Sequence, residues 1–169
     1  MNSIQLEKIL KCIIPSPSVK CLGVFPHDHT QFLVAHTLEA HSFPICFVSN
    51  THPSGFPGEH WVAFYYTSEN SAEFFDSYGN APSDYDFNIQ PCFSNPRMLQ
   101  REKSTVCGQY CIFYLYHRSR GKTMTQILTP FSGTDLAYND RSVARFVRNL
   151  TSSNKIYYSY IIIEFEWAN

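Results

Sequence analysis

Residues 104 to 121, STVCGQYCIFYLYHRSRG, place a cysteine and a glycine at the start of an apolar run that ends in basic residues. The run from Val106 to Arg118 is apolar on nearly every side, which predicts a helix buried against a sheet. Cys107 then stands where the helix begins, and there the unpaired backbone N–H groups and the helix dipole stabilise a thiolate. Gly108 has no side chain, so a substrate backbone can approach the sulfur closely. The pattern predicts a nucleophilic cysteine.

A nucleophilic thiolate also needs a base, normally histidine, and the histidine needs an acceptor that holds its ring. Of the seven histidines, only His60 stands at the start of a predicted strand, directly after a loop rich in Gly and Pro. Residues 60 to 67 and 72 to 79 are aromatic and strand-like, which predicts an antiparallel hairpin. Residues equidistant from a hairpin turn face each other, so His60 lies opposite a region in which Asp76 is the only carboxylate.

Attack on a carbonyl further requires a hydrogen-bond donor for the oxyanion that forms. Gln100 lies upstream of Cys107, on an irregular segment that leads into the helix. Its amide can point at the same carbonyl as the backbone N–H of Cys107. Every role in a cysteine hydrolase is then filled by one set of residues: His60, Asp76, Gln100 and Cys107.

Each of these residues has a simpler structural interpretation when it is taken alone. Cys107 would be a buried structural thiol, since free cysteines are among the most buried residues. His60 would be a histidine at a strand edge, and Asp76 would open a turn. Cys111, one helical turn after Cys107, is interpreted as a small core residue. The catalytic interpretation therefore depends on the constellation as a whole.

Several segments resemble the adenovirus protease (adenain) family and, more distantly, the ubiquitin-like (SUMO) proteases of the same clan. The resemblance is carried by PGEHWVAFYY, FFDSYG, a glutamine followed by six residues, and CGQYCIFYL. LGVFPHDH and PICFVSNTHPSGFPG are also similar to adenain-type sequence, so the resemblance covers about residues 20 to 120. The order His, Asp, Gln, Cys differs from papain-like enzymes, in which the cysteine comes first. Adenovirus enzymes usually carry Glu in the third role, whereas Asp76 is nearer to the SUMO-protease choice.

The resemblance implies an α+β fold in which a mixed central β-sheet packs against a buried helix that carries the nucleophilic cysteine at its N-terminus. It makes Cys107 the nucleophile and His60 the general base. It likewise makes Asp76 the residue that orients the base and Gln100 the oxyanion donor. The cleft beside the nucleophile would be lined by Trp61 and Gly108.

The implied activity is a viral or virus-derived cysteine endopeptidase that cleaves capsid or core precursors at small or Gly-containing sites, in the host nucleus or the virion. Adenovirus enzymes are stimulated by a disulfide-linked peptide and by DNA, and Cys92 is placed like the cysteine that accepts the peptide. Two alternatives remain open. One is an isopeptidase that removes ubiquitin-like modifiers, and the other is a catalytically silent scaffold or nucleic-acid-binding module of the same fold.

Length, composition and charge limit the classes of protein to which the chain could belong. The 169 residues, 44% of them hydrophobic, are enough to bury the core of one domain over residues 1 to 169. A net charge of -1 argues against a protein whose main role is to coat nucleic acid. The sequence shows no signal peptide and no membrane-length apolar stretch, so we expect an intracellular monomer without a membrane partner. In that setting the six cysteines are expected to be free thiols, metal ligands or catalytic groups.

Two further groups of residues were candidates for binding sites. Arginines 141, 145 and 148 share one face of a predicted helix over residues 139 to 150, and this face is either solvated or in contact with DNA. Histidines 27, 29, 36 and 41 fit no common zinc spacing, and the sequence has no CxxC. We therefore predict no metal site and no required organic cofactor.

The other expected elements follow from apolar spacing and from Pro and Gly. An amphipathic helix begins at Ser3, which would cap it, and ends before Pro15. Residues 43 to 50 form a continuous apolar run that suits a central strand covered on both faces. The remaining expectations are loops at residues 15 to 31 and 51 to 59 and a mostly irregular segment at 80 to 104. A short helix or turn is expected at 123 to 131, an Asn/Asp cap on the helix at 139 to 150, and a strand at 155 to 167, with a helix there as the alternative.

Overall fold

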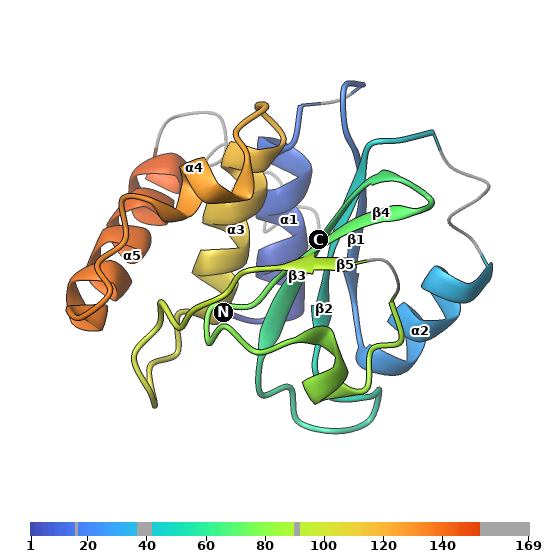
Figure 1. The fold of residues 1–169 in the computed structure, drawn as a ribbon, viewed down its shortest axis with the longest axis horizontal. Coiled ribbons are helices and arrows are strands. Elements are labelled where there is room, and N and C mark those ends of the chain that lie inside the picture. The colour runs from blue at the N-terminus through green and yellow to red at the C-terminus, as the bar shows by residue number, and fades with distance from the viewer. Residues whose placement is uncertain (16, 37–41, 90–91, 153–169) are drawn as a thin grey trace, which may run out of the picture.

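The structure, a computed structural model, describes residues 1–15, 17–36, 42–89 and 92–152. Within these residues the chain forms a mixed α+β fold around one five-stranded sheet (Figure 1). The strands lie in chain order, with the first pair and the last pair parallel and the middle pairs antiparallel. Their bounds are β1 (Lys20–Phe25), β2 (Ile45–Asn50), β3 (Trp61–Ser68), β4 (Ser71–Phe75) and β5 (Cys92–Ser94).

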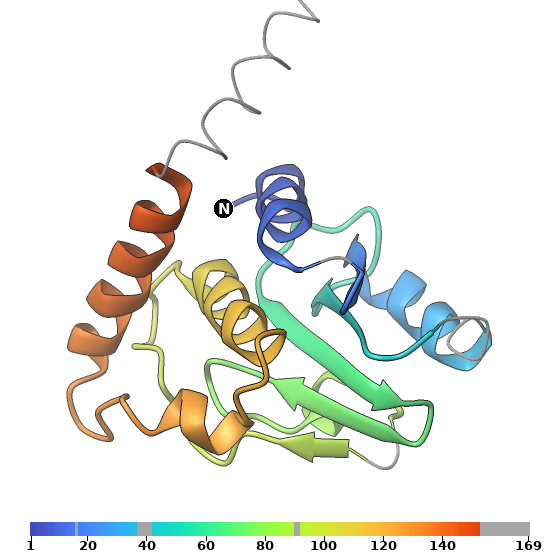
Figure 2. The ribbon, with the colours of Figure 1, turned by 90° about the horizontal axis from the view of Figure 1, so that it is seen from above.

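Helices cover both faces of this sheet. One face packs against α1 and α3, with α4 and α5 packed on α3, and the other packs against α2 and the segment that contains the short 3-10 helix η2 (Figure 2). The predicted strand at residues 155 to 167 lies outside the described residues. The helix bounds are α1 (Ser3–Ile13), α2 (His27–His36), η2 (Pro82–Tyr85), α3 (Cys107–Arg118), α4 (Met124–Leu128) and α5 (Leu136–Ser152).

The two covered faces explain why β2 and β3 have no polar alternation. Successive side chains of a strand point to opposite faces. Ala63 and Tyr65 of β3 therefore join the cluster under α1 and α3, whereas Phe64 and Tyr66 join the cluster on the other side. All six residues of β2 are buried. A strand between two apolar layers reads as a continuous apolar run, as the sequence predicted for residues 43 to 50.

The prediction of a loop over residues 15 to 31 was wrong, because this segment holds β1 and the start of α2. Gly23 interrupts the strand pattern, has a φ of 116° and coincides with a shift in register against β2. β1 is held by parallel pairing with β2, a long-range contact that the local sequence does not reveal.

The predicted caps of two helices were also wrong. Asn2, not Ser3, caps α1, since its side chain accepts from the Gln5 N–H at 2.9 Å. α5 begins before the predicted position, and the side chain of Asp135 accepts from the Tyr138 N–H at 2.8 Å. The predicted cap residues Asn139 and Asp140 instead lie buried inside α5.

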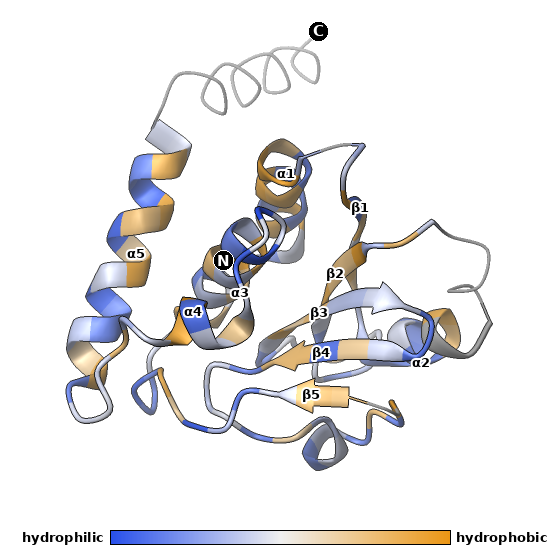
Figure 3. Cartoon of the chain, turned by 45° about the horizontal axis from the view of Figure 1, so that its top comes forward, coloured by the Kyte–Doolittle hydropathy of each residue, from blue (hydrophilic) through white to orange (hydrophobic). Residues whose placement is uncertain are grey.

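α5 places its apolar residues along one side, where Val143 and Val147 are buried against α3 (Figure 3). The three arginines of the predicted stripe are exposed on the other side. Among the described residues, no helix is both long and apolar enough to cross a membrane. The sheet and α3 therefore set the frame in which the candidate site is built.

Candidate active site

The hairpin brings His60 and Asp76 together. His60 directly precedes β3 and Asp76 directly follows β4, and the register Ala63 to Phe75 places both just beyond the same end of the ladder. His60 Nε2 lies 2.5 Å from Asp76 Oδ1, and both side chains are buried. A carboxylate only accepts, so Nε2 carries a hydrogen and Nδ1 is the ring nitrogen left for another partner.

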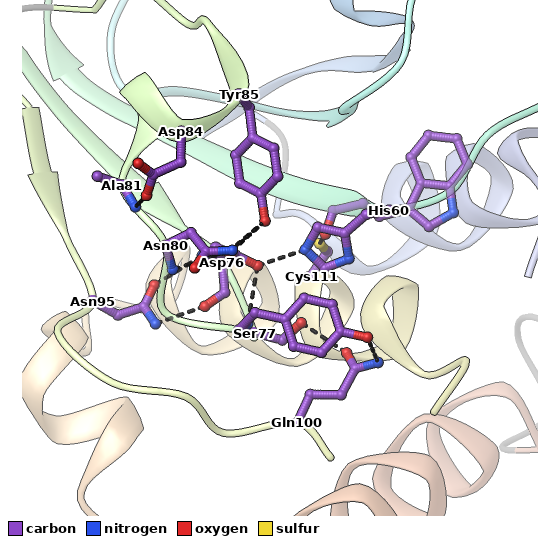
Figure 4. Close-up of polar contacts among 12 residues, drawn as sticks. His60, Asp76, Ser77, Asn80, Ala81, Asp84, Tyr85, Asn95, Gln100 and Cys111 are labelled. Carbon is purple, nitrogen blue, oxygen red and sulfur yellow. Dashed lines mark hydrogen bonds and ion pairs between the residues drawn. The ribbon is translucent and has the colours of Figure 1, made fainter. Parts of the chain in front are cut away.

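Asp76 is fixed by more than the histidine (Figure 4). The Tyr78 N–H donates to Oδ1 at 3.0 Å, and the Asn80 N–H donates to Oδ2 at 3.1 Å. The hydroxyl of Tyr85 donates to Oδ2 at 2.9 Å. Donors on both oxygens leave the carboxylate little freedom to turn away from the His60 ring.

A buried asparagine holds the backbone of Asp76. Asn95 Oδ1 accepts from the Asp76 N–H at 2.8 Å, and Asn95 Nδ2 donates to the Asp76 carbonyl at 2.6 Å. Asn95 and Tyr85 were not among the predicted site residues. The sequence offers no signal for them, because Tyr85 at the end of η2 and Asn95 directly after β5 reach Asp76 along paths that are set by tertiary packing.

Cys107 is the first residue of α3, and the His60 ring is the neighbour that most strongly favours the charged form of its thiol. Burial alone raises the pKa of this thiol. The bond to His60, the charge of that ring and the backbone N–H groups of Trp61 and Gly108 outweigh burial, so the pKa of Cys107 lies below its ordinary value.

The pKa of His60 moves in the opposite direction. Burial lowers it, but the hydrogen bonds and negative charges of Asp76 and Cys107 outweigh burial and raise the pKa of His60 to about 9. The two shifts together favour a thiolate beside an imidazolium over a neutral thiol beside a neutral ring. Such a pair is a nucleophile with an acid beside it.

A hollow of about 210 Å³ opens over the sulfur, and its lining includes Cys107, Trp61, Tyr78 and Gly58. Gly108 lies beneath Trp61, since a Cβ at position 108 would come within 3.4 Å of the indole Cδ1. Trp61 is half-buried and its Nε1 donates to the Met1 carbonyl at 3.3 Å. The two predicted cleft residues therefore lie together, with Trp61 in the wall and Gly108 beneath it.

Gln100 lies behind this hollow and is fully buried. Its Oε1 accepts from the Ser77 hydroxyl at 2.7 Å. Its Nε2 donates to the Ser104 carbonyl at 2.7 Å and to the Tyr78 hydroxyl at 3.2 Å. The structure thus ties Gln100 to Tyr78 and Ser104, two residues that line the hollow beside Cys107.

Two further cysteines lie in different settings. Cys92 is the first residue of β5 and is half-buried, and burial raises its pKa to about 11. Cys111 is buried and its thiol donates to the Trp61 carbonyl at 3.3 Å. A peptide disulfide at Cys92 and DNA contact through Arg141, Arg145 and Arg148 stay predictions.

The described part of the chain contains no group of three or more His, Cys, Asp or Glu side chains placed to hold a metal ion. Within the histidine set, His27 and His29 lie at the start of α2. The His27 ring packs against Phe87 with centroids 4.5 Å apart. A residue next to an aromatic ring in this way has a packing role.

Comparison with known proteins adds information about the fold. No protein-family model and no curated protein sequence matches this chain. The central domain of the uncharacterized Lpg1148 protein from Legionella pneumophila matches with a TM-score of 0.54 and 14% identity, over 90% of this chain and 98% of that one. A weaker match is the crystal structure of the ASFV pS273R protease, with a TM-score of 0.40 and 24% identity, over 58% of this chain and 42% of that one. The first match shows that the chain shares its fold with the Legionella domain.

Proposed function

We propose that this protein is a cysteine endopeptidase. The observation that carries the proposal is the line of contacts from the Cys107 thiol through the His60 ring to the Asp76 carboxylate. A scaffold has no physical need for an acidic thiol at a helix N-terminus, next to a histidine that a buried carboxylate orients.

The reaction follows from this geometry. The Cys107 thiolate attacks the carbonyl carbon of a peptide, an S–C bond forms and the π electron pair moves onto the oxygen. When the oxyanion collapses, the C–N bond breaks and the His60 imidazolium gives its proton to the leaving amine. Water then attacks the thioester with His60 as base, the acid is released and the thiolate–imidazolium pair is restored.

The proposed substrates are polypeptides that carry small residues at the scissile bond. The hollow over Cys107 has a glycine in its wall at position 58, which suits a closely approaching substrate backbone, whereas Gly108 lies buried under Trp61 and Met1. The assignment to capsid or core precursors, to a viral or virus-derived enzyme and to the host nucleus or virion rests on the sequence resemblance. So do the proposed peptide and DNA activators.

The test is intact-mass analysis after exposure to a Gly-Gly vinyl sulfone near pH 6. We expect one rapid adduct on the wild-type protein, mapped to Cys107, and none at that residue in Cys107→Ala. His60→Ala should react at least tenfold more slowly, because its thiol loses the positive neighbour that lowers its pKa. Cys12→Ala, which removes an exposed thiol on α1, is the matched control and should label like the wild type.

The proposal would be wrong under a clear set of results. Labelling would then be slow, distributed over several cysteines including Cys12, and the same in the wild type and in His60→Ala. In that case the chain would be a silent member of its fold.

A further inference from the structure

Tyr78 contacts every part of the candidate machinery. Its backbone N–H donates to Asp76 Oδ1 at 3.0 Å, and its ring lies against the His60 ring with centroids 4.7 Å apart and planes 30° apart. Its hydroxyl accepts from Gln100 Nε2 at 3.2 Å. The same side chain lines the hollow that holds the Cys107 sulfur.

The amide of Gln100 is fully occupied by its neighbours. The orientation of the amide is fixed, because the Ser104 carbonyl can only accept and must therefore face the NH₂ group. One amide hydrogen points at Ser104 and the other at Tyr78. To donate directly to a substrate oxygen, Gln100 would have to give up one of these two bonds.

The hydroxyl of Tyr78 differs from the Gln100 amide, because its hydrogen is not used in a bond to a described residue. One of its lone pairs accepts from Gln100, and among the described residues no acceptor takes its proton. A hydroxyl that accepts one hydrogen bond becomes a better donor of the next, because bonds in a chain polarise one another. This O–H is therefore free to turn toward a ligand in the hollow.

We propose, on the basis of the peptidase function above, that Tyr78 is a catalytic residue whose O–H donates a hydrogen bond to the oxyanion, with Gln100 as the positioning residue behind it. The backbone N–H of Cys107 supplies the second donor. The phenol keeps its proton during the step. The S–C bond forms, the carbonyl π pair moves onto oxygen, and the Tyr78 hydrogen bond strengthens as that charge develops.

The electrostatic setting suits a donor that must stay protonated. Burial raises the pKa of Tyr78, and the negative charges of Cys107 and Asp76 raise it further. The phenol therefore remains un-ionised throughout the pH range in which the thiolate–imidazolium pair exists.

The test separates hydrolysis from thiol reactivity in Tyr78→Phe. Hydrolysis of an acyl-Gly-Gly aminomethylcoumarin amide passes through an oxyanion, whereas alkylation of Cys107 by iodoacetamide does not. We expect kcat for the amide to fall about 100-fold with KM nearly unchanged, the loss typical of one oxyanion donor. The alkylation rate should stay within twofold of the wild type. Tyr138→Phe, at an exposed tyrosine of α5, should leave both rates unchanged.

Gln100→Ala tests the positioning role. It should lower kcat by a similar factor, and the double variant with Tyr78→Phe should be no slower than Tyr78→Phe alone, because Gln100 acts through Tyr78. Multiplied losses in the double variant would show that Gln100 acts independently and would overturn the inference.

Two other results also overturn the inference. A Tyr78→Phe variant that hydrolyses within twofold of the wild type shows that the hydroxyl is not an oxyanion donor. An equal fall in alkylation and hydrolysis shows that Tyr78 only packs His60 in place. If the wild type neither hydrolyses the amide nor shows rapid alkylation of Cys107, the proposed function itself fails, and this inference fails with it.

Discussion

The state of Cys107 depends on one neighbouring ring. The pKa of the thiol is lowered and that of His60 is raised to about 9, chiefly through the contact between the two groups and the contact of His60 with Asp76. Removing the ring leaves burial as the main influence on the thiol, and burial raises its pKa. The protonation state of the site is therefore a property of the Cys107–His60 pair and not of either residue alone.

This coupling predicts a shift in the pH dependence of alkylation. The rate of Cys107 modification by iodoacetamide in the wild type should rise with an inflection below the ordinary thiol value of 9.0. In His60→Ala the inflection should move above the wild-type value, because the thiolate has lost its cationic partner. The measurement is the pseudo-first-order rate by intact mass from pH 4 to 10, in a Cys12→Ala background. An unchanged inflection would contradict the assignment.

The rate of hydrolysis should also fall at alkaline pH. The leaving amine needs a proton from His60, and the charged form of His60 is present below its raised pKa and lost as the pH rises through about 9. The plot of kcat against pH should therefore fall near pH 9, while alkylation continues to a plateau.

The sequence could predict where three of the candidate residues lie, because their positions are constrained locally. Cys107 follows from the start of a helix, and His60 with Asp76 from the register of a hairpin. Tyr78 and Asn95 could not be assigned roles in the same way. Their contacts depend on how two irregular segments cross, and no local pattern encodes that crossing.

Among the elements, the turn after β4 and the segment that leads to α3 are packed with no room between them. Gly79 has a φ of 78°, and a Cβ there would lie 2.4 Å from the Arg97 carbonyl carbon. The turn carries Asp76 and Tyr78, and the crossing segment carries Asn95 and Gln100. The close packing of the turn on this segment therefore sets the distance from Asp76 and Tyr78 to their hydrogen-bond partners Asn95 and Gln100.

Gly79→Ala should therefore damage both stability and activity. Gly121→Ala is a matched control, because Gly121 also has a positive φ, 86°, but a Cβ there would meet nothing within 4 Å. The free energy of unfolding of Gly121→Ala should fall only by the cost of a left-handed backbone conformation at a residue with a Cβ, about 1–2 kcal/mol. Urea denaturation should show a larger loss for Gly79→Ala, together with slower labelling of Cys107. Equal losses in the two variants would show that the crossing is not tight.

The elements that could be predicted are those with strong local signals. The hairpin and the buried helix have continuous apolar patterns bounded by Pro, Gly or polar residues. β1 and the start of α5 were predicted wrongly. β1 is defined by its pairing with β2, and α5 buries two polar residues, Asn139 and Asp140, because Leu99 and Tyr110 supply their partners.

For the whole molecule, the sheet separates two apolar clusters, and α3 is attached to it through aromatic stacking. Phe75 at the end of β4 is buried and stacks on Tyr114 of α3, with centroids 4.5 Å apart and planes 5° apart. The residue after Phe75 is Asp76. The same contact therefore supports the fold and fixes the site relative to the helix.

Phe75→Ala should cost about 3–5 kcal/mol of unfolding free energy, since it leaves a cavity between the sheet and α3. Phe93→Ala, at a phenylalanine of β5 that is 58% exposed, should change stability by less than about 0.5 kcal/mol. Urea unfolding followed by circular dichroism measures both. Similar small losses in the two variants would mean that α3 is not held through Phe75.

The α+β class was predicted through the resemblance to the adenovirus protease family, and the match to the Legionella domain at 14% identity shows how few residue identities the fold requires. The parallel pairing of β1 with β2 and the cover of α2 on the second face could not be predicted. β1 and α2 have only weak apolar patterns of their own, and both are stabilised by contacts with the assembled sheet.

The separation of base and thiol on different elements has a consequence for the newly made chain. His60 and Asp76 belong to one hairpin and meet through contacts close in sequence, whereas Cys107 lies beside them only when α3 is docked on the sheet. Until that moment the sulfur has no histidine beside it and carries the reactivity of an ordinary thiol. Under the proposed peptidase function, a chain in which α3 has not docked would therefore not cleave its neighbours, because the thiol and its base are still apart.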